Sequence, residues 1–178
     1  MLTYVKNNFL SFIGLESNTT SHAEKLVSVL GGFIGIFMVT LISGYFVDQQ
    51  SAAFLVASMG ASAVLVFGVP HGSLSQPWQL IGGHLVSAVI GVTVAKWLPG
   101  TLIPGALAVA LAIGAMRYLR CVHPPGGATA LAAVVGGPAV HALGYSYVLT
   151  PVLLNAGVIL VAAILVNYAF PWRRYPAK

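Results

Sequence analysis

Two histidines in a nearly uncharged sequence are the residues of this chain best suited to chemistry. His123 opens a His-Pro-Pro-Gly-Gly-Ala-Thr run that ends at Thr129, and His84 follows a pair of glycines. Because histidine changes its charge near neutral pH, either ring could bind an anion or transfer a proton. No aspartate, glutamate, lysine or arginine occurs from Cys121 to Trp172, a stretch of 52 residues. Both motifs are therefore candidate sites in apolar surroundings.

The run that begins at His123 has the features of a small anion-binding site. Prolines fit the first turn of a helix, and glycines let a ligand approach the backbone closely. The first N–H groups of such a helix lack partners and carry partial positive charge, and Thr129 adds a hydroxyl donor. The alternative is a tight turn whose glycines serve helix packing. The candidate residues of this run are His123, Pro124, Pro125, Gly126, Gly127 and Thr129.

Four further residues complete the candidate binding set. His84 is ionisable within an apolar segment, which indicates function by default, although it could be a neutral histidine bonded to a backbone carbonyl. Gly60 and Ser62 belong to a Gly-Ala-Ser element similar to the glycine-rich run, although such a serine often bonds only its own helix. Asn155 lies in the second half of the chain, on the helix that corresponds to that of His84.

Catalytic residues are poorly represented. Glu16 and Glu24 precede the first apolar segment and Asp48 follows it, so no acid–base pair is available inside a membrane. The five histidines lack tight metal-ligand spacing, and no phosphate-binding or dinucleotide motif occurs. We therefore expect no enzyme activity, no metal and no cofactor.

The composition is typical of an integral membrane protein. Of 178 residues, 58% are hydrophobic and only 6% charged, whereas soluble domains carry about 25% charged residues. The mean hydropathy is +0.91. The net charge of +5 comes from basic residues scattered at segment ends, which argues against a nucleic-acid partner and favours a role in membrane topology.

Six apolar segments are candidate membrane spans, because a bilayer core of about 30 Å requires roughly 20 apolar residues in a helix. They comprise residues 26–46, 52–69, 79–98, 102–116, 127–143 and 148–170. The fifth is glycine-rich and is expected to be short or interrupted. The predicted fold class is an all-α polytopic membrane protein, with Phe170, Trp172 and Tyr175 as an aromatic belt after the last helix.

The basic residues favour six spans with both termini in the cytoplasm. In that arrangement only Lys96 lies outside, which is a strong positive-inside bias. Five spans would give four basic residues on each side, whereas a four-span arrangement also keeps the termini together and is not excluded by charge. We expect a bacterial inner-membrane location. The seven residues predicted inside are Lys6, Lys25, Arg117, Arg120, Arg173, Arg174 and Lys178.

A short internal similarity predicts two inverted three-helix repeats. Gly-Ala-Ser-Ala at Gly60 resembles Gly-Ala-Thr-Ala at Gly127, and each follows one long apolar segment and precedes another. A repeat with an odd number of spans must be inverted in the membrane, and ligands then bind where interrupted helices of the halves meet. Chance similarity is the alternative. The predicted organisation is a cytoplasmic or interfacial segment 1–25, one transmembrane domain 26–170 with halves 26–98 and 102–170, and a cytoplasmic tail 171–178.

The run from His123 to Ala130 resembles the HPP family of small integral membrane proteins. The Gly60-Ala-Ser element, the Gln76-Pro loop and the Gly-Gly-His84 element are similar to the family pattern, and the resemblance covers about residues 26–170. Trp78 departs from the pattern, because a basic residue commonly follows Gln-Pro. The resemblance implies nitrite transport, known for members in cyanobacteria and chloroplasts, and four spans rather than six.

Together these observations predict transport of a small monovalent anion, most simply nitrite, by a carrier or a channel. A proton or neutral-solute pathway that uses the same histidines is an open alternative. Another is a non-transporting membrane subunit of a partner complex. A homo-oligomer is expected in each case because helix faces of small residues are abundant.

Overall fold

The structure is a computed structural model that describes residues 12–13 and 20–177, and in these residues the secondary structure is helical, without strands. The predicted cytoplasmic or interfacial segment 1–25 lies largely outside the described residues. In chain order the elements are α2 (His22–Phe46), α3 (Gln49–Ala63), η1 (Val64–Gly68), η2 (Ser73–Ser75), α4 (Pro77–Trp97), α5 (Leu102–Tyr118), α6 (Pro124–Val135), α7 (Gly137–Leu143), η3 (Val148–Leu153), α8 (Leu154–Tyr168) and η4 (Pro171–Arg173).

Among the described residues, three helical stretches are long and apolar enough to cross a membrane. These are α2, α4 and the continuous stretch Val148–Tyr168 formed by η3 and α8. The pair α6 and α7 counts as a fourth only if the two helices form one broken span, because they are bent by 101°. The predicted interruption of the fifth segment is therefore present at Gly136 and Gly137. The structure confirms an all-helical membrane protein with three clear spans, or up to four, by helix length and composition. The shorter apolar helices Ala52–Gly68 and Leu102–Tyr118 fall below the length of a span, so the six predicted spans are not confirmed.

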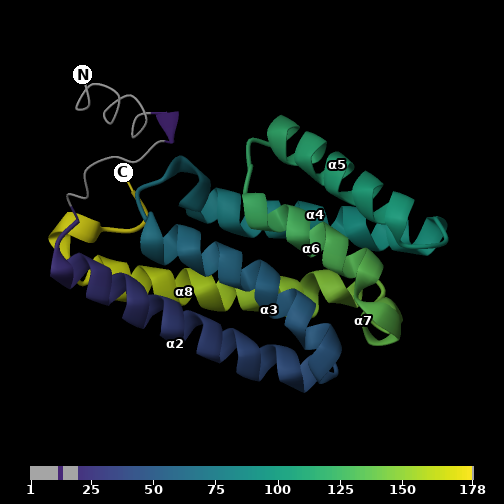
Figure 1. Cartoon of the computed structure of the whole chain (residues 1–178), viewed down its shortest axis with the longest axis horizontal. Helices are drawn as coiled ribbons and strands as arrows, with labels where there is room; N and C mark the ends of the chain where they lie inside the picture. The colour runs from purple at the N-terminus through teal and green to yellow at the C-terminus, as the bar shows by residue number, and fades with distance from the viewer. Residues whose placement is uncertain (1–11, 14–19, 178) are drawn as a thin grey trace.

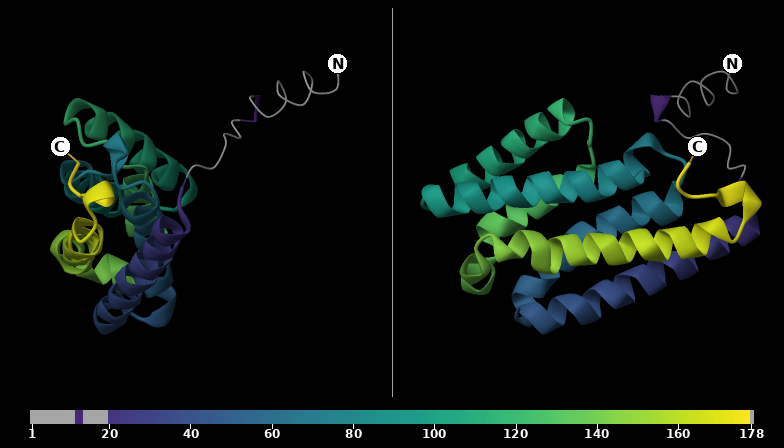
Figure 2. Two further views of the ribbon diagram at one scale, coloured as in Figure 1. Left: turned by 90° about the vertical axis from the view of Figure 1, so that its left-hand side faces the viewer. Right: turned by 180° about the vertical axis from the view of Figure 1, so that it is seen from behind.

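The helices pack as two adjoining groups, which Figures 1 and 2 show from three sides. Helices α2, α3 and α8 form one group, and α4, α5 and α6 form the other. Contacts of α3 with α6, and of α4 with η3 and α8, join the groups. The N-terminal end of α2 and the C-terminal end of α8 lie at the same end of the bundle, at the left of Figure 1, which we call the terminal end.

Glycines bring α4 and α6 into close contact. A Cβ atom on Gly91 would lie 2.5 Å from the Ala130 carbonyl oxygen and 2.8 Å from the Cβ of Ala133. A Cβ on Gly83 would lie 2.5 Å from the Cβ of His123. Small residues at such positions let the backbones of membrane helices approach closely, so these glycines set the distance between the two helices.

Replacing Gly91 with alanine is expected to destabilise the protein by about 1–3 kcal/mol, because overpacking shifts the backbone. Thermal unfolding in detergent measures the effect. Gly114→Ala on α5 is the matched control, since a Cβ there meets no atom within 4 Å. We expect that variant to be as stable as the wild type or slightly more stable, given the helix propensity of alanine. Equal losses in both variants would contradict close packing at Gly91.

The residues after α8 fold back over the terminal end, and we call residues 171–177 the C-terminal strap. The Arg173 side chain is fully buried. It donates through Nε to Asn167 Oδ1 at 2.7 Å and through a terminal nitrogen to the Phe67 carbonyl. Its guanidinium also lies 3.7 Å from the Glu24 carboxylate. Burial lowers the pKa of Arg173, whereas the Glu24 carboxylate raises it. This residue, predicted as a topology determinant, also connects η1, α2 and α8.

The predicted aromatic belt is wrong at Tyr175. Its ring is fully buried and its hydroxyl donates to the Ser75 carbonyl at 2.7 Å, whereas Trp172 is about half exposed. The main-chain N–H of Ala177 donates to Gln76 Oε1 at 2.9 Å. Tyr175 thus turns inward because the strap finds hydrogen-bond acceptors in the 69–76 loop between η1 and α4.

Candidate functional site

Five polar side chains meet inside the bundle, where α3, α4 and the start of α6 come together. Ser58 and Ser62 lie one turn apart on α3, His84 on α4, His123 immediately before α6, and Thr129 on α6. Each is at most 1% exposed. We call these five residues the buried polar cluster. Buried polar groups are costly unless they are hydrogen-bonded, so the partners of each determine whether the cluster is stable.

The cluster forms one continuous chain of hydrogen bonds. Ser62 Oγ lies 2.9 Å from His123 Nε2 and 2.7 Å from His84 Nε2. The other nitrogen of His84, Nδ1, lies 2.7 Å from Thr129 Oγ1, which lies 2.6 Å from Ser58 Oγ. The two imidazole rings are 5.1 Å apart between centroids and meet edge to face. A single serine hydroxyl therefore links both histidines.

One backbone carbonyl fixes the proton positions of the neutral cluster. His123 Nδ1 lies 2.8 Å from the Leu74 carbonyl oxygen, so Nδ1 must carry a proton and Nε2 of the neutral ring must accept one. Ser62 then donates to His123 and accepts from His84 Nε2–H. His84 Nδ1 in turn accepts from Thr129. The hydrogen-bond partners thus assign opposite tautomers to the two histidines.

Local sequence explains how His123 reaches the cluster. Helix α5 ends in a turn in which Arg120 has a left-handed φ of 55°, and Pro124 and Pro125 then occupy the first turn of α6. His123 itself is the extended N-cap residue, so its side chain points across to α3 and α4. Gly83 leaves the space that the His123 backbone and Cβ require.

Four predicted residues are brought together by the fold, namely His84, His123, Ser62 and Thr129. Pro125 also contributes, because its carbonyl accepts from Ser58 at 3.2 Å. Pro124 begins α6, and Gly126 and Gly127 follow in its first turn. For Gly126 the packing alternative fits the geometry, since a Cβ there would lie 2.7 Å from Ser87 Oγ and 2.9 Å from the Gly83 carbonyl oxygen. At Gly127 a Cβ would make only an ordinary contact, 3.7 Å from Val109, so packing does not require a glycine at that position.

Two predicted residues lie away from the cluster. Gly60 lines an apolar groove between α2 and α3, because it is two residues from Ser62 and so faces another side of the helix. Asn155 on α8 is buried and donates to Ser43 Oγ of α2 at 2.8 Å, while its Oδ1 lacks a partner among the described residues. The predicted correspondence between Asn155 and His84 therefore does not place them in one site.

Two residues of the site were not predicted. Ser58 precedes Ser62 by four residues, a spacing that places both on one helix face and that could have revealed it. Tyr147 donates its hydroxyl to the Thr129 carbonyl at 3.0 Å, which ties the segment before η3 to α6. No local signal distinguishes Tyr147 from other tyrosines. Trp78, which departs from the family pattern, donates to the Leu119 carbonyl at 3.1 Å rather than facing the cluster.

The cluster is not arranged for a metal ion. Within residues 12–13 and 20–177 no group of three histidine, cysteine or acidic side chains gathers closely enough to hold one. The nitrogens of the two histidines also face Ser62, Thr129 and Leu74, so each ring nitrogen already has a partner. The arrangement can donate hydrogen bonds to a small ligand or pass protons.

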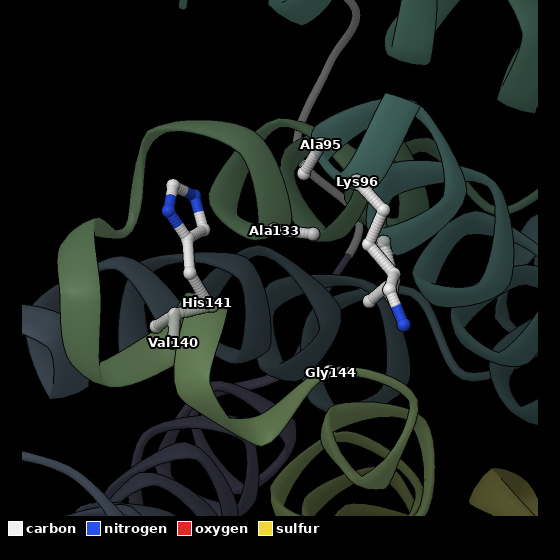
Figure 3. A pocket seen from close by; sticks show the side chains of 7 residues that line it. Ala95, Lys96, Ala133, Val140, His141 and Gly144 are labelled. Atoms are coloured by element: carbon white, nitrogen blue, oxygen red, sulfur yellow. The ribbon is translucent and has the colours of Figure 1, made fainter. Parts of the chain in front are cut away.

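A separate small pocket lies near the C-terminal end of α4, and Figure 3 shows its lining. Its volume is about 40 Å³, and Lys96 and His141 are its polar residues. His141 Nε2 donates to the Val134 carbonyl at 2.9 Å, and the Lys96 ammonium lies 4.9 Å from the centroid of the Tyr145 ring. Both groups are thus engaged, and the pocket does not connect to the cluster through any shared residue.

An apolar helical bundle that encloses the buried polar cluster defines the class, an integral membrane protein with several spans. The chain belongs to the HPP family, because residues 17–176 match the family described as HPP, transmembrane region. The family resemblance expected from the sequence is therefore confirmed.

Two transmembrane proteins of Dictyostelium discoideum are similar to this chain. One is 39% identical over 153 residues, which covers 84% of this chain and 49% of the relative. The other is 38% identical over 181 residues, which covers 97% of this chain and 63% of the relative. The chain thus spans about half the length of one relative and less than two thirds of the other. No solved structure matches the chain.

Proposed function

We propose that the protein moves a small monovalent anion across the membrane, with nitrite as the substrate, by a carrier or channel mechanism. The observation that carries the proposal is the meeting of five uncharged donor residues at the centre of an apolar bundle. In this proposal the protein is a transporter rather than an enzyme and uses no cofactor.

Neutral donors suit a substrate that must also be released. An anion loses its hydration inside a bundle, and hydrogen bonds from hydroxyl and imidazole groups replace part of that hydration. Arginine or lysine in the same position would bind the anion more strongly and retain it. Because the cluster is closed, the anion would replace the bonds between Ser62, Thr129 and the histidines as α6 moves relative to α3 and α4.

The six-span, inverted-repeat arrangement also belongs to this proposal. The repeat makes α2, α3 and α4 the counterparts of α5, α6 and α8. Each pair of helices that packs together in the bundle should then have a counterpart pair that also packs together. Helix α2 packs against α3 and α8, and α5 packs against α6 and α4, as the repeat requires. Helices α3 and α6, which carry the similar Gly-Ala-Ser and Gly-Ala-Thr elements, pack against each other. This pattern supports a binding site between the halves.

We further propose a bacterial inner membrane with both termini in the cytoplasm. Lys25, Arg173 and Arg174 lie at the terminal end of the bundle, whereas Lys96 ends α4, which begins at that end. This distribution agrees with the positive-inside rule. Labelling of single cysteines placed at residues 23 and 98 in intact cells tests the orientation. Reaction of the cysteine at residue 23 from outside the cell would show that the protein has the opposite orientation.

A homo-oligomer is the expected state in the bilayer. Gly32 and Gly44 on α2 and Gly157 on α8 leave open space at the helix surface, and Gly157 lines an apolar groove between these helices. Such faces favour close contact between membrane helices. Cross-linking in proteoliposomes at low protein density measures the state, and active monomers would exclude an obligate oligomer.

Nitrite uptake into proteoliposomes that contain only this chain is the direct test, with empty vesicles as the reference. Saturable uptake supports the proposal, and the absence of uptake from correctly folded protein overturns it. Competition by other small anions then establishes the substrate range.

Two substitutions at Thr129 test the cluster itself. Thr129→Val keeps the shape of the side chain but removes the hydroxyl that lies 2.7 Å from His84 and 2.6 Å from Ser58. We expect uptake to fall at least about tenfold, which corresponds to about 1.4 kcal/mol. Thr129→Ser keeps the hydroxyl and should retain uptake within about threefold. Equal uptake by both variants would remove Thr129 from the pathway.

A further inference from the structure

We propose that the buried polar cluster is a proton relay that couples proton movement to transport of the anion. The inference rests on the proposed function for its anion and on the hydrogen-bond geometry for its proton. The geometry allows the cluster to accept one excess proton without leaving any member unbonded.

The neutral cluster is fully bonded in one direction. Ser58 donates to Thr129, Thr129 to His84 Nδ1, His84 Nε2–H to Ser62, Ser62 to His123 Nε2, and His123 Nδ1–H to the Leu74 carbonyl. Every hydroxyl and every imidazole then gives one hydrogen bond. All donors thus point toward the Leu74 end.

An excess proton on His84 is accommodated by reversing only the part of the chain beyond it. Both nitrogens of His84 then donate, Nε2–H to Ser62 as before and Nδ1–H to Thr129 at 2.7 Å. Thr129 donates to Ser58, and Ser58 turns its hydroxyl to the Pro125 carbonyl at 3.2 Å. That carbonyl gives the reversed chain a final acceptor, so no donor is left unpaired.

The same proton can move on to His123 through Ser62. The proton on His84 Nε2 passes to Ser62 Oγ while the Ser62 hydroxyl proton passes to His123 Nε2, across distances of 2.7 and 2.9 Å. The charge is then on His123, and His84 is neutral with its proton on Nδ1. The number of protons is unchanged by this step, because one bond to hydrogen breaks for each that forms.

The two ends of the relay differ in their access to solvent. Ser58 and Pro125 lie within the bundle, whereas Leu74 belongs to the 69–76 loop and is 38% exposed. The other titratable side chains beside the cluster are those of Tyr147 and Cys121. Tyr147 donates to the Thr129 carbonyl, and Cys121, two residues before His123, packs against Gly82 of α4. Movement of the loop away from His123 Nδ1 would release the proton at the terminal end.

Nitrogen-15 NMR of histidine-labelled protein in bilayers tests the relay without transport. At alkaline pH we expect His84 to be protonated on Nε2 alone and His123 on Nδ1 alone. Acidification should produce one imidazolium shared by the pair and should bring the Nδ1–H form of His84 into the spectrum. The single variants His84→Gln and His123→Gln assign the signals. Identical tautomers at alkaline pH, or no protonation of either ring above the pH of unfolding, would overturn the relay.

Proton flux separates the relay from the transport proposal. Vesicles with an internal pH dye receive a nitrite gradient at alkaline pH, with the membrane potential clamped by potassium and valinomycin. We expect inward proton movement with nitrite, reduced at least about tenfold in Ser62→Ala because the link between the histidines is lost. Ser87→Ala is the matched control, since Ser87 contacts Met116 rather than the cluster. Its flux should match the wild type.

The possible outcomes distinguish the proton relay from transport of the anion. Nitrite uptake without proton movement overturns the relay and leaves anion transport standing. Proton movement under a pH gradient without nitrite uptake supports the relay and overturns the choice of anion. Loss of proton flux in Ser87→Ala as severe as in Ser62→Ala overturns the assignment of the relay to the cluster.

Discussion

A His84→Leu variant is expected to take up nitrite no faster than empty vesicles. His84 holds both Ser62 and Thr129 at 2.7 Å, so its removal breaks the path of side-chain hydrogen bonds between these two residues. Leucine also leaves the two hydroxyls without their partner in the interior, at about 1–3 kcal/mol each. The loss of either bond alone would slow uptake about tenfold or more. The measurement is initial uptake per reconstituted protein.

The controls separate loss of the site from loss of the fold. His84→Gln places an amide near the position of Nε2, so it can keep the bond to Ser62 while losing that to Thr129, and we expect an intermediate rate. His22→Ala removes an exposed histidine at the start of α2, outside the cluster, and should leave uptake unchanged. Wild-type uptake by a folded His84→Leu protein would place the anion pathway elsewhere in the bundle.

Arg173→Leu is expected to lower the free energy of unfolding by about 2–4 kcal/mol. The substitution leaves Asn167 Oδ1 and the Phe67 carbonyl without their donor and removes the partner of Glu24. Relief from burying a cation offsets part of this loss, which is why the expected effect is smaller than the sum of the contacts. Thermal unfolding in detergent gives the measurement.

The neighbouring Arg174 provides the control for this experiment. It is exposed and lies 5.7 Å from the centroid of the Tyr168 ring, a contact worth about 0.5–1 kcal/mol at such sites. Arg174→Ala removes the same charge from the strap and should change the stability little. If both variants unfold at the same temperature, charge alone accounts for the effect and the buried contacts of Arg173 contribute nothing.

The sequence predicted the helical class and the principal site residues because their signals are local. A proline pair after His123 predicts a helix start, and an ionisable residue between apolar neighbours at His84 predicts an enclosed polar group. The number of spans was harder to predict, since hydropathy does not show the 101° bend between α6 and α7. Gly136 and Gly137 only indicated that an interruption was present.

The errors came from contacts between distant parts of the chain. Gly60 and Asn155 were chosen by motif and by correspondence between halves, and neither argument fixes the direction in which a helical residue points. Tyr175 was assigned to an aromatic belt because nothing local shows that the chain turns back to Ser75. Ser58 is the exception, because its four-residue spacing from Ser62 was available in the sequence.

Neighbouring carbonyls of the 69–76 loop connect the C-terminal strap with the buried polar cluster. The Leu74 carbonyl holds the buried His123, and the next carbonyl, that of Ser75, holds Tyr175 of the strap. The two carbonyls belong to consecutive residues, so a shift of the loop as a whole carries both of them. A shift of the strap that moved Tyr175 would therefore reach His123 through two consecutive residues of the loop. The loop thus couples the position of the strap to that of the buried histidine.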